Sequence, residues 1–181
     1  MQHPIPRQQS GEHPGVDNDA ALSDELAAVV AGARRRAVRD GDRQVDTAHL
    51  LHSLLEHDPD VRAVFDSEPQ LARLLGYLVQ RSIGYGLRWQ TAVEDSGTVP
   101  VVSGVPGRSP LAAAAMAYAA ERAARRGDGR ARGLDLLAGI VVDPRSRAVE
   151  VLERAGVEAP ELFLRIEHGA RECVEGFEAG C

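Results

Sequence analysis

The sequence predicts an all-α protein made of two pseudo-symmetric four-helix repeats, with about eight helices and no convincing strand. Three pairs of segments match in the same order. They are 36–42 with 122–128, Leu50-Leu51 with Leu136-Leu137, and, after a one-residue slip, 58–64 with 143–149. Turn residues, apolar pairs and helix caps all recur, which indicates a duplicated helical unit with two packed halves.

Bulk composition narrows the possible classes of protein. A chain of 181 residues with 44% hydrophobic and 4% aromatic residues predicts one domain whose core is Ala, Leu and Val. The net charge of −6 does not favour a nucleic-acid partner. Because no apolar run is long enough to cross a membrane and no signal-peptide core is visible, we expect a cytoplasmic protein without a membrane partner.

The first repeat is expected at 22–83, within a folded domain at 21–168. Residues 1–20 contain Pro and Gly without apolar periodicity, which predicts a disordered tail. Ser23 is a good N-cap for the first helix and is followed by two acidic residues. Gly41 is placed to end that helix.

Three further helices are predicted in this repeat. Asp46 or Thr47 caps the second helix, and its apolar stripe consists of Leu50, Leu51, Leu54 and Leu55. Asp58, followed by proline, stops it and starts a short third helix through Phe65. Ser67 then begins a fourth helix.

A segment rich in Gly and Pro at 84–108 is predicted to link the repeats. Linkers of this length are often functional. Its valines Val99, Val101 and Val102 could cover the groove between the repeats or could be ordinary loop residues.

The second repeat is expected at 109–168, followed by a C-terminal tail at 169–181. Ser109, followed by proline, caps its first helix. The apolar face of its second helix consists of Leu134, Leu136, Leu137, Ile140 and Val141. Gly156 is a plausible C-cap for the third helix, and Pro160 opens the fourth.

Candidate chemistry is sparse, so we expect no enzyme, cofactor or metal. His49, His52 and Glu56 could share a helix face, but nothing else in the sequence completes a metal site. No nucleophile elbow occurs, and we expect Cys173 and Cys181 to be free thiols.

The start of the second helix in each repeat is the most specific motif. Residues 46–51 read DTAHLL, and residues 132–137 read RGLDLL. With the order of helices and turns, these segments resemble the Clp N-terminal domain, in which this position typically reads Gly-Thr-Glu-His-Leu-Leu. That domain is the double-repeat module at the front of Clp-family AAA+ unfoldases such as ClpA and ClpC. The resemblance covers about 22–167, and no phosphate-binding loop of an ATPase is present.

The resemblance implies a non-catalytic module that binds peptides or proteins near the starts of the first two helices of each repeat. The ligand-binding positions so implied are Leu22, Ser23, Thr47, Ala48, Arg108, Ser109, Gly133 and Leu134. In ClpC-type relatives, glutamates at two of these positions help to bind phosphoarginine. Because Ala48 and Leu134 replace them, we do not expect phosphoarginine binding of that kind.

The resemblance also implies partners. They would be Clp substrates, adaptors or unfoldase subunits, with the chain acting as an adaptor, decoy or regulator of Clp-type proteolysis. An alternative role is sequestration of cyclic peptide antibiotics, although Arg108 replaces the aromatic residue that often stands at this position.

Arginine clusters lie at matching ends of the two repeats. The candidate docking patches are Arg35, Arg36, Arg39, Arg122, Arg125 and Arg126. They either bind acidic partners or form a solvated helix face whose cations favour the helix C-terminus. A DNA-associated regulator is a further alternative, which the acidic total charge and the lack of a recognisable helix-turn-helix argue against.

Overall fold

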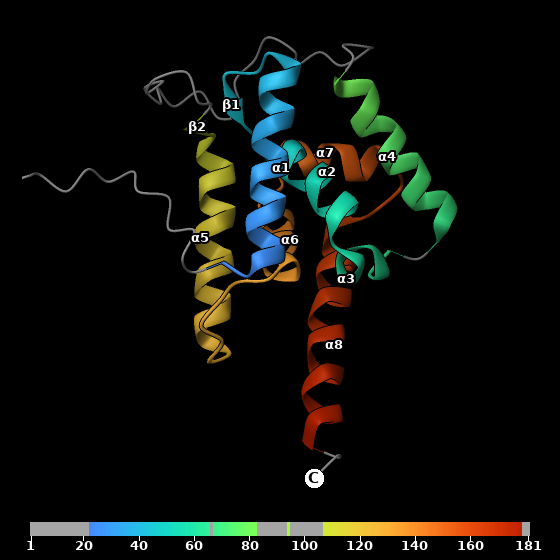
Figure 1. The fold of residues 1–181 in the computed structure, drawn as a ribbon. Coiled ribbons are helices and arrows are strands. Elements are labelled where there is room, and N and C mark those ends of the chain that lie inside the picture. The colour runs from blue at the N-terminus through green and yellow to red at the C-terminus, as the bar shows by residue number, and fades with distance from the viewer. Residues whose placement is uncertain (1–21, 66, 83–93, 95–106, 179–181) are drawn as a thin grey trace, which may run out of the picture.

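The computed structural model describes residues 22–65, 67–82, 94 and 107–178, with only the backbone described at 170–178. The helices in these ranges are α1 (Asp24–Asp40), α2 (Thr47–His57), α3 (Pro59–Ala63), α4 (Glu68–Ser82), α5 (Pro110–Arg125), α6 (Gly133–Val142), α7 (Arg147–Arg154) and α8 (Ala159–Glu178). The predicted all-α fold of two four-helix repeats is confirmed (Figure 1).

Two strands of two residues each are present, although none was predicted. They are β1 (Gln44–Val45) and β2 (Gly107–Arg108), and they pair in parallel. Leu22 and Ala131 form a second parallel bridge. Such short strands carry no periodicity of their own, because contact between the repeats creates them.

The strand pairing relates the repeats by pseudo-two-fold symmetry. The segment before α2 pairs with the segment before α5, and Ser109 donates its backbone N–H to the carbonyl of Val45 at 2.9 Å. The segment before α1 pairs with the segment before α6, and Ser23 donates to the carbonyl of Ala131, also at 2.9 Å. In both cases, therefore, the segment before the second helix of one repeat pairs with the segment before the first helix of the other.

Helices α2 and α6 occupy the interior. Every residue of α2 from Thr47 to Leu55 is buried, and α6 is buried from Asp135 to Val141. The largest fully buried side chains are Leu26, Leu50, Leu51, Leu54, Leu55, Leu74, Leu78, Leu136, Leu137, Ile140, Leu152 and Leu162. This is the aliphatic core that the low aromatic content predicts.

Small residues allow the central helices to approach their neighbours. A methyl group added at Gly139 of α6 would lie 2.5 Å from the backbone oxygen of Ala115 in α5. In the other repeat, a methyl group at Gly32 of α1 would collide with the Ser53 hydroxyl of α2. The matching close contacts set the position of each central helix against the first helix of its own repeat.

Most of the predicted helix ends are confirmed. Ser23 and Ser109 cap α1 and α5, each accepting from the backbone three residues later at 3.1 Å. Gly41 and Gly127 turn the chain with φ of 74° and 76°, a region that favours glycine. The third helix is shorter than predicted and ends at Ala63.

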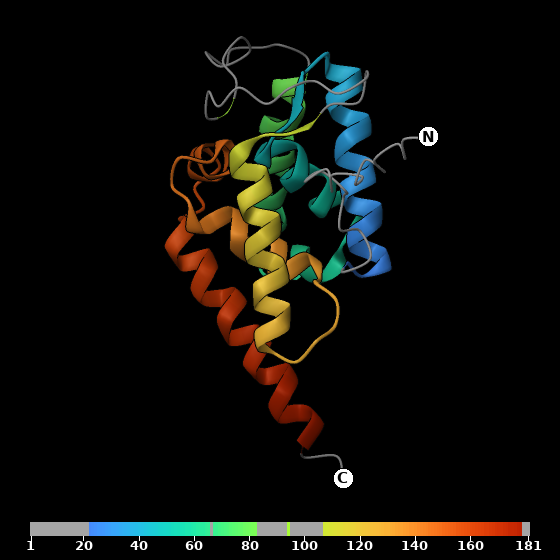
Figure 2. The same cartoon turned by 90° about the vertical axis from the view of Figure 1, so that its left-hand side faces the viewer.

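Helix α8 runs to Glu178, past residue 168 where the second repeat was expected to end, and its C-terminal end projects beyond the other helices (Figures 1 and 2). The predicted tail at 1–20 and most of the linker, with its three valines, lie outside the described residues. So do the side chains of Cys173 and Cys181. Among the helices of the described ranges, none combines the length and apolar character needed to cross a bilayer.

Candidate partner-binding junctions

The eight implied ligand-binding residues gather at two places, which we call the first and second junctions. The first junction joins Thr47 and Ala48, at the start of α2, to Arg108 and Ser109, before α5. Thr47, Ala48 and Ser109 are buried, and Arg108 is partly exposed. Direct contact with a partner at this junction would therefore involve its rim.

The second junction joins Leu22 and Ser23, before α1, to Gly133 and Leu134, at the start of α6. Leu22 and Gly133 are buried, whereas Ser23 and Leu134 are partly exposed. Leu134 also packs against the core. The structure thus pairs the helix starts across the repeats, which sequence spacing alone did not reveal.

Glu94, in the linker, is a junction residue that the sequence analysis did not identify. Its side chain is buried, and both carboxylate oxygens accept hydrogen bonds. Thr47 donates its backbone N–H to Oε2 at 3.0 Å and its hydroxyl to Oε1. Ser109 donates its hydroxyl to Oε2 at 2.6 Å, and Arg147 donates its backbone N–H to Oε1 at 2.9 Å. A single acid in a segment rich in Gly and Pro gives no periodic signal.

The Glu94 carboxylate lies at two helix N-termini. Thr47 and Arg147 are the first residues of α2 and α7, so their N–H groups have no partner within their own helix. The positive end of each helix dipole favours an anion there. The Thr47 hydroxyl also accepts from the backbone N–H of Ala148 at 3.1 Å, which fixes the direction in which it donates.

A carboxylate also lies against the start of α6 in the second junction. A methyl group at Gly133 would collide with Asp58 Oδ2. The other oxygen of Asp58 caps α3, accepting from Asp60 at 2.9 Å and Val61 at 3.1 Å. Asp58 is therefore part of the helical body, whereas Glu94 comes from the segment between the repeats.

A buried charge cluster adjoins the first junction around His49. Asp46 Oδ1 accepts from the His49 backbone at 2.9 Å, and the His49 Nδ1 lies 2.8 Å from the same oxygen. His49 Nε2 lies 3.1 Å from Asp42 Oδ2 and 3.8 Å from Asp40 Oδ2. Arg81 of α4 pairs with both Asp42 and Asp46.

These contacts shift two pKa values in opposite directions. Burial raises the pKa of Asp46, but hydrogen bonds with His49 and the charges of His49 and Arg81 outweigh it and hold this pKa far below its usual range. Burial lowers the pKa of His49, but hydrogen bonds to Asp42 and Asp46 outweigh it and raise this pKa above 6.5. The cluster therefore favours an imidazolium beside aspartates.

The same cluster has the ligand types of a metal site, because Asp42, Asp46 and His49 each offer one atom within 4.8 Å of the others. Two arginines already occupy the aspartates, since Arg147 donates to Asp46 at 2.9 Å in addition to the contacts of Arg81. Arg39 pairs with Asp40 as well, so each of the three aspartates near His49 already has an arginine partner. The arrangement therefore fits a protonated histidine better than a divalent cation.

His52 and Glu56 do not join His49. Their closest atoms lie 3.7 Å apart, and Glu56 also pairs with Arg36 of α1. Burial and the charge of Arg36 lower the pKa of His52 to about 4. His49, His52 and Glu56, which the sequence could place on one helix face, thus lie in two separate environments.

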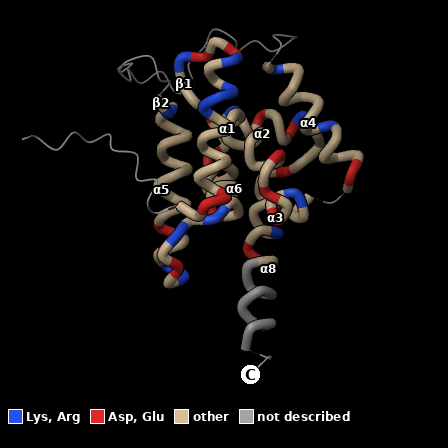
Figure 3. Tube along the Cα trace, viewed as in Figure 1, with Lys and Arg blue, Asp and Glu red and all other residues tan. Residues whose placement is uncertain are grey.

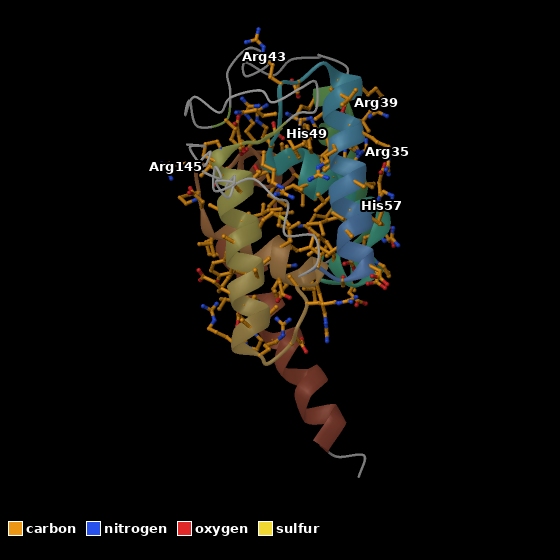
Figure 4. All side chains as sticks on the ribbon, turned by 60° about the vertical axis from the view of Figure 1, so that its left-hand side comes forward. Arg35, Arg39, Arg43, His49, His57 and Arg145 are labelled. Carbon is orange, nitrogen blue, oxygen red and sulfur yellow. The ribbon has the colours of Figure 1, made fainter. Side chains whose placement is uncertain are left out.

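The first arginine patch is only partly exposed. Arg36 pairs with Glu56, and its side chain is mostly buried. Arg35 is exposed, and the side chain of Arg39 is 63% exposed. Figure 4 shows both on the outer side of α1, with His49 in the interior. Figure 3 shows positive charge along the C-terminal part of α1.

The second arginine patch is largely an internal ion-pair network. Arg122 is buried and donates to Asp135 at 3.1 Å and to Glu167. Arg126 also pairs with Asp135. Arg125 is exposed and lies over the ring of Tyr118. Arg122 thus links α5, α6 and α8.

Comparison with solved structures relates this arrangement to known proteins. The N-terminal domain of the caseinolytic protease associated chaperone ClpD from Arabidopsis thaliana matches with a TM-score of 0.56 and 15% identity, over 84% of this chain and 99% of that one. The chain has the fold of the Clp N-terminal domain. A protein from a malarial protein secretion system matches with a TM-score of 0.59 and 14% identity, over 82% of this chain and 94% of that one.

Comparison at the level of sequence gives no match. No protein-family model matches the chain, and no curated protein matches it. The Clp N-terminal-domain fold is therefore visible in the helix arrangement at a sequence identity too low to carry residue roles.

Proposed function

We propose that this chain is a non-catalytic module that binds peptides or proteins and acts as an adaptor, decoy or regulator of Clp-type proteolysis. The observation that carries the proposal is the pair of junctions, where the helix starts of one repeat meet those of the other. ClpD is a protease-associated chaperone, and its N-terminal domain has the same fold.

The partly exposed residues suggest how a partner would bind. Leu134 and Arg108 offer an apolar and a cationic contact at the rims of the two junctions. The exposed Arg35 and Arg39 on α1 add positive charge outside the junctions. These features favour a partner segment with both apolar and acidic residues.

A reconstituted degradation assay tests this function. The purified chain is added to a Clp unfoldase and its peptidase while they degrade a fluorescent substrate. A decoy slows degradation by competing for substrate or adaptor, whereas an adaptor accelerates degradation of its cargo. Absence of any effect, together with no binding to either component by calorimetry, would contradict the proposal.

Two matched variants separate a junction effect from a general surface effect. Leu134→Arg places a charge at the rim of the second junction, and Leu164→Arg places the same charge on α8, where Leu164 is 56% exposed. We expect only Leu134→Arg to remove the effect on degradation, by at least about tenfold. Circular dichroism shows whether both variants remain folded.

Small ligands test phosphoarginine binding and the sequestration of cyclic peptide antibiotics. Phosphoarginine, a phosphoarginine peptide and a cyclic peptide antibiotic are titrated separately, with the melting temperature as the readout. We expect no response to phosphoarginine, because Ala48 and Leu134 supply no carboxylate for its guanidinium. Saturable stabilisation by the cyclic peptide alone would support the sequestration role.

A further inference from the structure

We propose that Glu94 is an internal ligand of the first junction, occupying a built carboxylate site that also accepts a carboxylate of a partner peptide. This inference rests on the proposed function, because it names the chemical group that this junction recognises. It also makes the Glu94 contact self-inhibitory, since the chain and its partner compete for the same donors.

The donors around Glu94 come from three separate parts of the fold. Thr47 begins α2, Ser109 precedes α5, and Arg147 begins α7. Glu94 belongs to none of these elements, and the residue is nevertheless only 4% exposed. The folded repeats thus create the donor set independently of the residue that fills it.

The number and distribution of donors match a carboxylate. Oε1 accepts from the Thr47 hydroxyl and the Arg147 N–H, and Oε2 accepts from the Thr47 N–H and the Ser109 hydroxyl. Each oxygen of an ionised carboxylate has two acceptor positions, so all four are used. A phosphate group would bring further oxygens beyond the positions that these four donors match.

The second junction provides an internal comparison. The start of α6 at Gly133 also has a carboxylate against it, but that group belongs to Asp58, which simultaneously caps α3. Asp58 is the residue directly before α3, so its exchange would leave that helix without its N-cap residue. Glu94 accepts from the first N–H groups of α2 and α7 but belongs to neither helix, so an external carboxylate could accept the same hydrogen bonds. Of the two junctions, the first is therefore the one open to an external carboxylate.

The direct test uses Glu94→Ala, which empties the site and leaves its donors in place. Acetate is the first probe, with chloride at equal ionic strength as the control. We expect Glu94→Ala to melt below the wild type and to recover part of the loss saturably with acetate. The wild type should show no acetate-specific shift, because Glu94 already fills the site.

A double variant ties the response to these donors. Thr47→Val in the Glu94→Ala background removes one hydroxyl donor while keeping the side-chain shape. We expect acetate affinity to fall about tenfold or more. Acetate binding that is unchanged in this double variant would overturn the proposal.

Peptides then identify the source of the carboxylate. Three short peptides are compared on Glu94→Ala by calorimetry: one with a free C-terminus, one amidated with an internal glutamate, and one amidated without an acid. Binding of either acidic peptide, with weaker or no binding to the wild type, supports the proposal. A folded Glu94→Ala that responds to none of these probes would overturn it.

Two outcomes separate this inference from the proposed function. If Glu94→Ala binds carboxylates and the chain does not affect Clp-type degradation, the site stands and the proposed function fails. If degradation is affected equally by the wild type and by a folded Glu94→Ala without carboxylate binding, the internal ligand is disproved and the proposed function stands. Failure of both Glu94→Ala and Glu94→Gln to fold even in acetate would make Glu94 a structural brace and overturn the inference.

Discussion

His49 and Asp46 cap the start of α2 in both directions. The backbone N–H of His49 donates to Asp46 Oδ1 at 2.9 Å, and the backbone N–H of Asp46 lies 3.2 Å from His49 Nδ1. When the ring is protonated, Nδ1 donates instead to Asp46 Oδ1, which lies 2.8 Å away. The cap therefore changes its hydrogen bonding with the charge on His49.

This cap predicts that stability falls as pH rises above neutrality. The pKa of His49 is raised in the folded state, so its contribution is complete below the unfolded value of 6.5 and is lost as pH rises through the folded value. The groups facing the ring are Asp40, Asp42, Asp46 and Arg81. Urea denaturation from pH 6 to 9 measures the effect.

His49→Gln is the matched control, because glutamine at this helix position can also return a hydrogen bond to the cap residue but does not titrate. We expect this variant to show a flatter dependence of unfolding free energy on pH over the same range. An unchanged pH dependence in the variant would assign the titration to another group.

His52 predicts the opposite dependence on the acidic side. Its folded-state pKa is lowered to about 4, because of burial first and the charge of Arg36 second. Below pH 6.5 the unfolded chain binds a proton that folded His52 does not, so stability falls as pH decreases, by up to about 1.4 kcal/mol per pH unit. His52→Gln should reduce this slope between pH 5 and 6.5, and an identical slope would refute the assignment.

Arg122 and Arg125 predict unequal stability effects on one helix. Arg122→Met removes the arginine that joins Asp135 to Glu167, while Arg126 still pairs with Asp135, and we expect a loss of about 2 kcal/mol in unfolding free energy. Arg125→Met changes an exposed side chain and should cost less than about 0.5 kcal/mol. Chemical denaturation of both variants provides the comparison, and equal losses would contradict the network.

Gly139 and Gly76 predict opposite signs for the same substitution. Gly139→Ala forces a methyl group against the Ala115 backbone and should destabilise the protein by about 1–3 kcal/mol. Gly76 lies in α4 with no atom near its added methyl group, so Gly76→Ala should stabilise by up to about 1 kcal/mol. Thermal unfolding tests both, and a stabilising Gly139→Ala would show that α5 and α6 can separate without cost.

Local sequence signals predicted most of the helical fold because each depends on neighbouring residues. Ser23 and Ser109 were recognisable as caps from the residues that follow them, and Gly41 as a helix end from its place in the repeat. The α3 end was predicted two residues late, since apolar periodicity does not distinguish the last helical turn from the chain beyond it.

The site was less predictable because its parts are distant in sequence. The resemblance marked Thr47 and Ser109 separately, but only the fold shows that both donate to Glu94. Likewise Arg122 belongs to an arginine cluster in the sequence, and only its contacts with Asp135 and Glu167 reveal a buried network. Charge patterns alone do not show which cations are already paired.

The reciprocal bridges, Val45 with Arg108 and Leu22 with Ala131, follow the geometry of an isologous dimer. In such a dimer each subunit presents the same surface and its complement. Each repeat carries both pairing segments, one before its first helix and one before its second helix. Two identical copies would therefore be enough to form both junctions. Because one chain carries both repeats, the two junctions need not be identical, and a residue from between the repeats, Glu94, contacts the first junction.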